Sequence, residues 1–114
     1  MTPLFVDRIT RPEPHGAGFA QFEGEYRKAL ERGTEIRIDA GKRGEYPVAP
    51  GEGAVLYVLQ GAVRFEGDDT PAGEGDTVWF RPAAAGENAV RLGIEADMPF
   101  RGVLVTGRGG AAAS

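Results

Sequence analysis

The sequence contains no cysteine, a single histidine and no long apolar run among its 114 residues. Without cysteine, the chain can form neither disulfide bonds nor thiolate metal sites. A transmembrane helix needs about 18 or more consecutive apolar residues, so we expect none. Charged residues near the N-terminus, among them Asp7 and Arg8, are also unlike the apolar segment of a signal peptide. These absences favour a cytoplasmic protein.

The chain also lacks an excess of basic residues. It has 13 lysines and arginines against 17 aspartates and glutamates, which gives a net charge of −4 at neutral pH. A nucleic-acid-binding surface usually shows the opposite balance, so we expect no nucleic-acid partner and no membrane partner. With 41% hydrophobic and 26% charged residues, the composition is typical of one globular domain.

Glycine and proline, in contrast, are plentiful, with 18 glycines and 8 prolines along the chain. Between them lie short β-branched or aromatic runs, at residues 4–9, 34–40, 54–60, 62–67, 77–80, 89–96 and 100–106. Many short strands separated by turn residues predict an all-β sandwich or barrel. One segment, residues 23–32, is rich in helix-forming residues and is followed by Gly33, which predicts one short helix.

The run 54–60 is apolar on both faces of its predicted strand. Successive side chains of a strand point to opposite faces. The face expected inside a barrel carries Ala54, Leu56 and Val58. The outer face carries Val55, Tyr57 and Leu59, and its apolar character predicts a second layer or a second subunit over it. We predict a homodimer with an interface made of Val55, Tyr57, Leu59 and Trp79.

The order and spacing of glycines and strands resemble the two conserved segments of the cupin superfamily. The residues that carry the resemblance are Gly41, the run 54–61, the strand 62–65 and the strand-opening segment 75–80. The resemblance implies a small double-sheet jelly-roll barrel over residues 34–106. Residues 1–33 would then form an N-terminal arm that packs on the barrel, and residues 107–114 a flexible tail.

Metal-binding cupins carry two histidines and a glutamate in the first segment and another histidine in the second. Aligned by the glycines, these positions are held here by Pro47, Ala49, Ala54 and Gly86. None of the four offers an imidazole or a carboxylate, so the resemblance implies a member without metal and without another cofactor. The runs 57–65 and 103–107 also give a more distant likeness to the metal-free C-terminal domain of pirin-type bicupins, from which no activity carries over.

Polar residues that could serve a ligand are expected mainly near the mouth of the barrel. The speculative ligand-binding set is Tyr46, Gln60, Arg81, Glu87 and Asn88. The Arg81 guanidinium could bind a carboxylate or a phosphate with two hydrogen bonds. The alternative is an exposed ion pair between Arg81 and Glu87, which would contribute little energy. No catalytic residue is assigned.

The single histidine and a group of carboxylates are weaker candidates. His15 could be a base or a ligand only if the N-terminal arm carried it over the barrel, and a surface loop is the simpler interpretation. The carboxylates are Asp68, Asp69, Glu74 and Asp76. Their spacing is typical of turns and does not match a calcium-binding loop.

Two functions of different classes follow from these residues. The first is a metal-free cupin-like homodimer that binds a small molecule or has a structural role, and we favour it. Its lumen would be either filled or open to a ligand, and the lining residues expected are Leu56, Val58, Val63, Phe65, Val78, Phe80 and Leu92. The alternative is a metal-independent isomerase, cyclase or lyase acting on a small metabolite, with Tyr46, Arg81 and Glu87 as catalytic candidates.

Overall fold

The computed structural model of the chain describes residues 2–11, 17–49, 52–66, 68–81 and 90–107. In chain order its elements are β1 (Thr2–Pro3), β2 (Val6–Thr10), α1 (Ala17–Arg32), β3 (Thr34–Ile38), β4 (Arg43–Val48), β5 (Gly53–Phe65), β6 (Asp68–Gly73), β7 (Thr77–Phe80) and β8 (Val90–Gly107). The predicted all-β fold with one helix is therefore confirmed. The helix ends where the sequence predicts but begins six residues earlier, at Ala17 rather than at Glu23.

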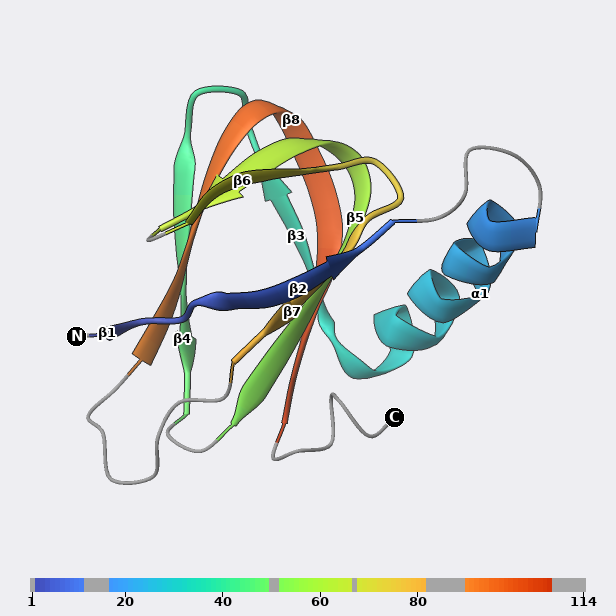
Figure 1. Ribbon diagram of the computed structural model, residues 1–114, viewed down its shortest axis with the longest axis horizontal. Helices are drawn as coiled ribbons and strands as arrows, with labels where there is room; N and C mark the ends of the chain where they lie inside the picture. The colour runs from blue at the N-terminus through green and yellow to red at the C-terminus, as the bar shows by residue number, and fades with distance from the viewer. Residues whose placement is uncertain (1, 12–16, 50–51, 67, 82–89, 108–114) are drawn as a thin grey trace.

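The long strand β8 organises the sheet, because it pairs with four other strands (Figure 1). It is antiparallel to β3, β4 and β5 and parallel to the short β1. On the far side of β5, β7 and then β2 continue the sheet, and β6 pairs with β5. The strands curl into a barrel of the jelly-roll type (Figure 1). The N-terminal strands β1 and β2 thus belong to the same sheet as the barrel strands.

Glycines mark the bends that let β5 and its neighbours follow the curvature. Gly41, Gly61 and Gly75 are the three glycines with positive φ among the described residues. At Gly61 φ is 95°, and the β5–β8 register shifts on either side of this residue. A Cβ atom at Gly61 would also collide with the backbone carbonyl oxygen of Pro99 in β8. The bend therefore requires glycine for two reasons, its dihedral angle and the close approach of the two strands.

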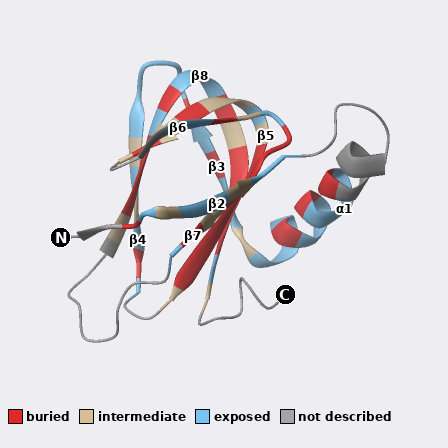
Figure 2. Cartoon of the chain, viewed as in Figure 1, coloured by how far each residue is buried: buried red, intermediate tan, exposed pale blue. Residues whose placement is uncertain are grey.

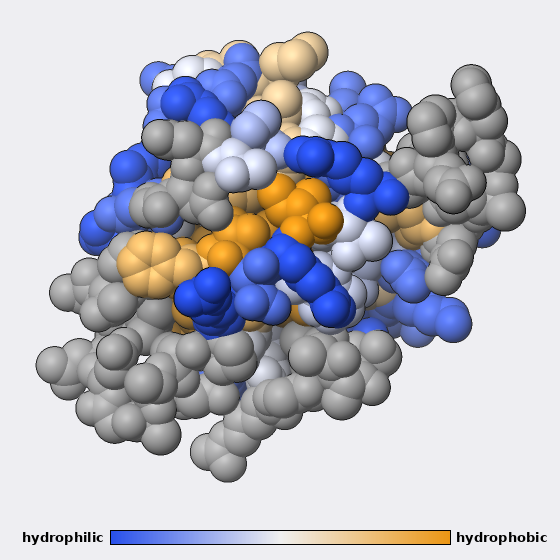
Figure 3. Space-filling view, viewed as in Figure 1, coloured by the Kyte–Doolittle hydropathy of each residue, from blue (hydrophilic) through white to orange (hydrophobic). Residues whose placement is uncertain are grey.

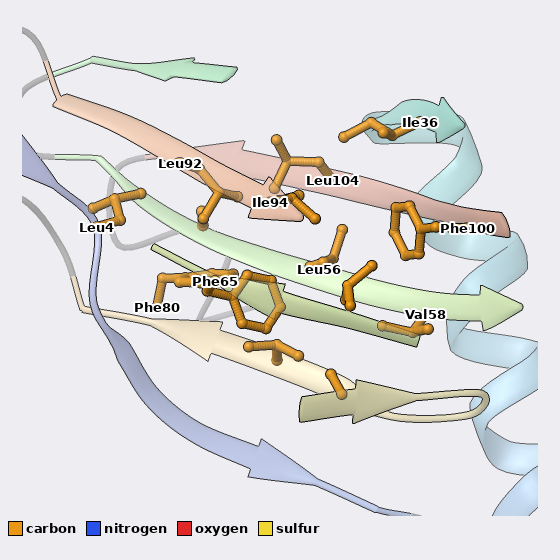
Figure 4. Packing of buried hydrophobic residues seen from close by; sticks show 14 of the residues in the cluster. Leu4, Ile36, Leu56, Val58, Phe65, Phe80, Leu92, Ile94, Phe100 and Leu104 are labelled. Atoms are coloured by element: carbon orange, nitrogen blue, oxygen red, sulfur yellow. The ribbon is translucent and has the colours of Figure 1, made fainter. Parts of the chain in front are cut away.

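The barrel interior is filled by apolar side chains from nearly every strand (Figure 4). The alternation predicted for β5 is confirmed: Ala54, Leu56 and Val58 lie in this interior cluster. All seven residues expected to line the lumen belong to it as well. At one end of the cluster, the rings of Phe65 and Phe80 meet edge to face, with 5.1 Å between their centroids.

The outer face of β5 is covered by the chain's own helix. Val55 and Tyr57 pack with Val103 and Val105 of β8 against a second apolar cluster, to which α1 contributes Phe22, Tyr26 and Ala29. Figure 2 shows the buried stripe of α1 turned toward the sheet. The second layer expected over the run 54–60 is therefore α1. Val55 and Tyr57, 2% and 8% exposed, are not available to a second subunit while the helix lies there.

Gly33 explains how the helix passes into the sheet. Its amide donates to the carbonyl oxygen of Ala29, which closes the last turn of α1. A Cβ atom at Gly33 would lie 2.5 Å from the carbonyl oxygen of Leu104 and 2.8 Å from a methyl carbon of Val103. Gly33 therefore permits the close contact between the helix end and β8. Its φ is not in the left-handed region, so the space and not the dihedral angle calls for glycine here.

Candidate functional site

The residues predicted for the barrel mouth are only partly brought together. Arg81, with 69% of its side chain exposed, lies with Nε 3.6 Å from Oδ1 of Asp7. Tyr46 is partly buried in β4, where it packs against the interior cluster and burial raises the pKa of its hydroxyl. Glu87, Asn88 and Gly86 lie outside the described residues, as does His15. The ion pair that the structure shows for Arg81 is thus with Asp7.

Of the positions that the cupin resemblance assigns to metal ligands, Ala54 lies in the apolar interior, whereas Pro47 and Ala49 are exposed. Ala54 is 2% exposed and pairs across the sheet with Phe80, which is 5% exposed. Pro47 is exposed in β4 opposite Arg91, and Ala49 is exposed just beyond the end of β4. Among the described residues, no three histidine, cysteine, aspartate or glutamate side chains are grouped as a metal site would need. The donor set does not fit a metal of the usual cupin kind.

The segment that carries Asp68, Asp69, Glu74 and Asp76 consists of strand β6 and the turn that follows it. Asp76 is buried, and its Oδ2 accepts hydrogen bonds from the Gly73 amide at 2.9 Å and from Arg11 Nε at 3.2 Å. This carboxylate holds the β6–β7 turn and ties the end of β2 to it. Glu74 is exposed, and the side chains of Asp68 and Asp69 lie outside the described set. The geometry around Asp76 is that of turn chemistry.

A hollow in the described part of the chain lies beside Gln60 of β5, six residues beyond Ala54. It is an open pocket of about 250 Å³, lined by Arg37, Ile38, Asp39, Gln60, Pro99, Phe100 and Arg101. Three strand segments meet there: the end of β3, the part of β5 around Gln60, and the part of β8 around Pro99, where the β5–β8 register is irregular. Gln60, predicted as a ligand-binding residue, is the member of that set found in this pocket.

Two arginines give the pocket its charge. Arg37 of β3 and Arg101 of β8 stand directly opposite each other in the antiparallel ladder, and Arg101 is also aligned with Gln60 of β5. Glu35 reaches both arginines: Oε1 lies 3.3 Å from Arg37 Nε, and Oε2 lies 3.2 Å from an Arg101 terminal nitrogen. Sequence reasoning missed the two arginines, because their pairing depends on a β3–β8 register that the run 34–40 does not reveal by itself.

Elsewhere on the barrel, charged side chains form ion pairs across strands. Glu66 lies 2.8 Å from Arg43 and 3.0 Å from Arg91, and its hydrogen bond with Arg91 lowers the pKa of the Glu66 carboxyl. Arg64 pairs with Asp97 at 2.8 Å and lowers the pKa of that carboxyl. These exposed pairs contribute little stability. Arg37 and Arg101, which share Glu35, differ from these pairs because both also line the pocket.

Comparisons with known proteins bear on the fold. No protein-family profile matches the sequence, and no curated protein matches it. Among solved structures, the chain is similar to the protein GK1651 of Geobacillus kaustophilus, with a TM-score of 0.61 and 23% identity over 65% of this chain and 29% of that chain. It is also similar to quercetin 2,3-dioxygenase of Acinetobacter baumannii, with a TM-score of 0.54 and 16% identity over 65% of this chain and 24% of that chain.

A third similar structure is a de novo designed double-stranded β-helix, with a TM-score of 0.52 and 21% identity over 67% of this chain and 99% of that chain. At these identities the likeness concerns the fold alone. The chain has the double-stranded β-helix fold that these structures share with it. It spans less than a third of the length of the two natural proteins. Within the described residues, no helix is long and apolar enough to cross a membrane.

Proposed function

We propose that this cupin-like domain works without a metal, as a cytoplasmic homodimeric module that binds a small molecule outside the barrel interior. The observation that carries the proposal is the filled interior at the position where cupins place their carboxylate ligand. Ala54 stands there, with Phe80 opposite it in the ladder and Leu92 in the same buried cluster. A packed apolar interior leaves the surface as the place for polar recognition.

Pairing of two chains is part of the proposal, but the surface differs from the one expected. Figure 3 shows an apolar patch on the face that β2 crosses, with hydrophilic side chains above and below it. Val6 and Ile9 of β2 are partly buried and pack against the interior cluster. Phe5, next to this strand, is 45% exposed. A second copy would cover such a patch. Analytical ultracentrifugation should give twice the 12.1 kDa chain mass, and Phe5→Ser should reduce it to one chain.

Metal dependence is tested on the unaltered chain, purified without a histidine tag. We expect its iron, manganese, nickel and zinc content to stay far below one ion per chain. Its unfolding temperature should be the same with a chelator as with added metal, because a bound metal would stabilise the folded state. A stoichiometric metal whose removal lowers the unfolding temperature would contradict the proposal.

A further inference from the structure

We propose that the pocket of Arg37, Gln60 and Arg101 binds the oxyanionic group, carboxylate or phosphate, of a small metabolite. The inference rests on the proposed function, since it supplies the site and the ligand class for a module that binds outside its barrel interior. Gln60 stands six residues after Ala54 on β5, roughly 20 Å along an extended strand. The pocket is therefore well separated from the position at which cupins hold their metal.

The arrangement of the two arginines is the first argument. Like charges directly opposite each other in a sheet repel, and this pairing is unfavourable unless an anion offsets it. Glu35 supplies one carboxylate to both, and Arg101 contacts it through Nε and a terminal nitrogen. Arg37 contacts it through Nε, which leaves the terminal nitrogens of Arg37 without a hydrogen-bond partner among the described residues. The pair retains donors for a second oxyanion.

The shape and chemistry of the walls are the second argument. A volume of about 250 Å³ suits a molecule of a few carbon atoms and is below the range of most drug-sized sites. Ile38, Pro99 and Phe100 supply apolar wall, and the Gln60 amide can both donate and accept.

Asp39 adds a carboxylate to the same wall. The lining holds two arginines and one aspartate, and Glu35 pairs with both arginines beside the pocket, so these four side chains together carry no net charge. A ligand that presents an oxyanion to the arginines and a hydroxyl to Asp39 would match both signs of charge. This distribution favours hydroxy acids and sugar phosphates over simple dicarboxylates.

The experiment titrates the unaltered chain with malate, succinate and inorganic phosphate at constant ionic strength and follows amide resonances by NMR. Malate carries the hydroxyl that succinate lacks, and phosphate represents the other source of oxyanion. We expect saturable shifts at Gln60 and Arg101, with malate binding more tightly than succinate if the ligand is a hydroxy acid. If phosphate saturates the pocket and neither acid does, the natural ligand carries a phosphate group.

Substitutions then locate the binding. Arg37→Gln and Arg101→Gln should each weaken it about tenfold or more, since each removes charge-assisted hydrogen bonds. The matched control is Arg43→Gln, because Arg43 and Arg101 are similarly exposed, at 45% and 43% of the side chain. This control should bind like the unaltered chain. Circular dichroism of each variant checks that the fold is kept.

Two outcomes would overturn the inference. One is the absence of saturable shifts at the pocket with all three probes. The other is binding whose affinity is the same in Arg37→Gln and Arg101→Gln as in the unaltered chain. The ligand would then bind elsewhere, and the proposed metal-independent function would still stand. A stoichiometric metal, in contrast, would refute the proposed function whatever the pocket does, so the two failures are distinguishable.

Discussion

Ala54 of β5 faces Phe80 of β7 across the antiparallel ladder, and both side chains are buried in the barrel interior. The ring of Phe80 also meets Phe65 edge to face. A cupin would place a carboxylate ligand at the position of Ala54, where this chain has a methyl group among aromatic and aliphatic side chains. The filled interior is thus the physical basis of our proposal that this domain works without a metal.

The bend at Gly61 provides a first test of the fold. Gly61→Ala should lower the free energy of unfolding by at least about 2 kcal/mol, because an L-residue is strained at positive φ and its Cβ would collide with the Pro99 carbonyl. The matched control is Gly24→Ala, since Gly24 is exposed in α1 with open space around it. It should raise stability by about 0.5–1 kcal/mol. Urea unfolding measures both changes, and equal effects would contradict the assignment of the bend.

The three tyrosines predict how stability depends on alkaline pH. Burial raises the pKa of Tyr26, Tyr46 and Tyr57, so the folded chain holds these protons more tightly than the unfolded chain. Their contribution is therefore complete below about pH 10, the unfolded value, and is lost as the pH rises through the raised folded values. Urea unfolding at about pH 8 and about pH 11 should show this decline. Tyr46→Phe should make the decline less steep, and a stability independent of alkaline pH would refute the burial of these hydroxyls.

The hydroxyl of Tyr26 predicts an unusual stabilising substitution. It is fully buried and makes no hydrogen bond of ordinary geometry with a described residue, although Arg101 is close enough to lower its pKa against the larger effect of burial. Tyr26→Phe removes the unsatisfied group and keeps the ring that packs on Phe22. We expect a gain of about 1 kcal/mol in the free energy of unfolding. A loss of similar size would show that the hydroxyl has a partner that matters.

The contact between α1 and the sheet predicts what happens when the helix is displaced. Ala29 is 0% exposed within the outer cluster, so a carboxylate at this position cannot be accommodated there. Ala29→Glu should release α1 and expose Val55 and Tyr57. Increased binding of a hydrophobic dye and concentration-dependent association would report the exposed face. Lys28→Glu, at an exposed neighbouring position, is the control and should behave like the unaltered chain.

Much of the fold could be predicted from the sequence, because glycines and alternating side chains determine local geometry directly. Gly41, Gly61 and Gly75, on which the cupin resemblance partly rests, have positive φ, but Gly61 bends the continuous strand β5 and does not join two separate strands by a tight turn. The alternation also placed the side chains of residues 54–59 on their correct faces. The early start of α1 was missed, since Gly18 lowers the helix propensity of residues 17–22.

The candidate site was harder to predict because it depends on contacts distant in sequence. Arg37 and Arg101 are 64 positions apart and meet only through the β3–β8 ladder. The covering of Val55 and Tyr57 by α1 likewise depends on tertiary packing, and an apolar outer face alone fits a helix or a subunit equally well. The alternation of the run 54–60 would turn Gln60 toward the barrel interior, but the β5–β8 register shifts on either side of it and Gln60 lines the exposed pocket instead.

The free energy of unfolding of Ala54→Glu, measured with and without added iron, manganese, nickel or zinc, tests the central claim most directly. We predict a loss of about 3 kcal/mol or more, because the carboxylate would be buried beside Phe80 without a partner, and no metal should restore it. Ala49→Glu, at an exposed cupin ligand position, should have almost no effect. Near-normal stability of Ala54→Glu, or its rescue by a metal, would show that the interior can hold a metal site and would contradict the account.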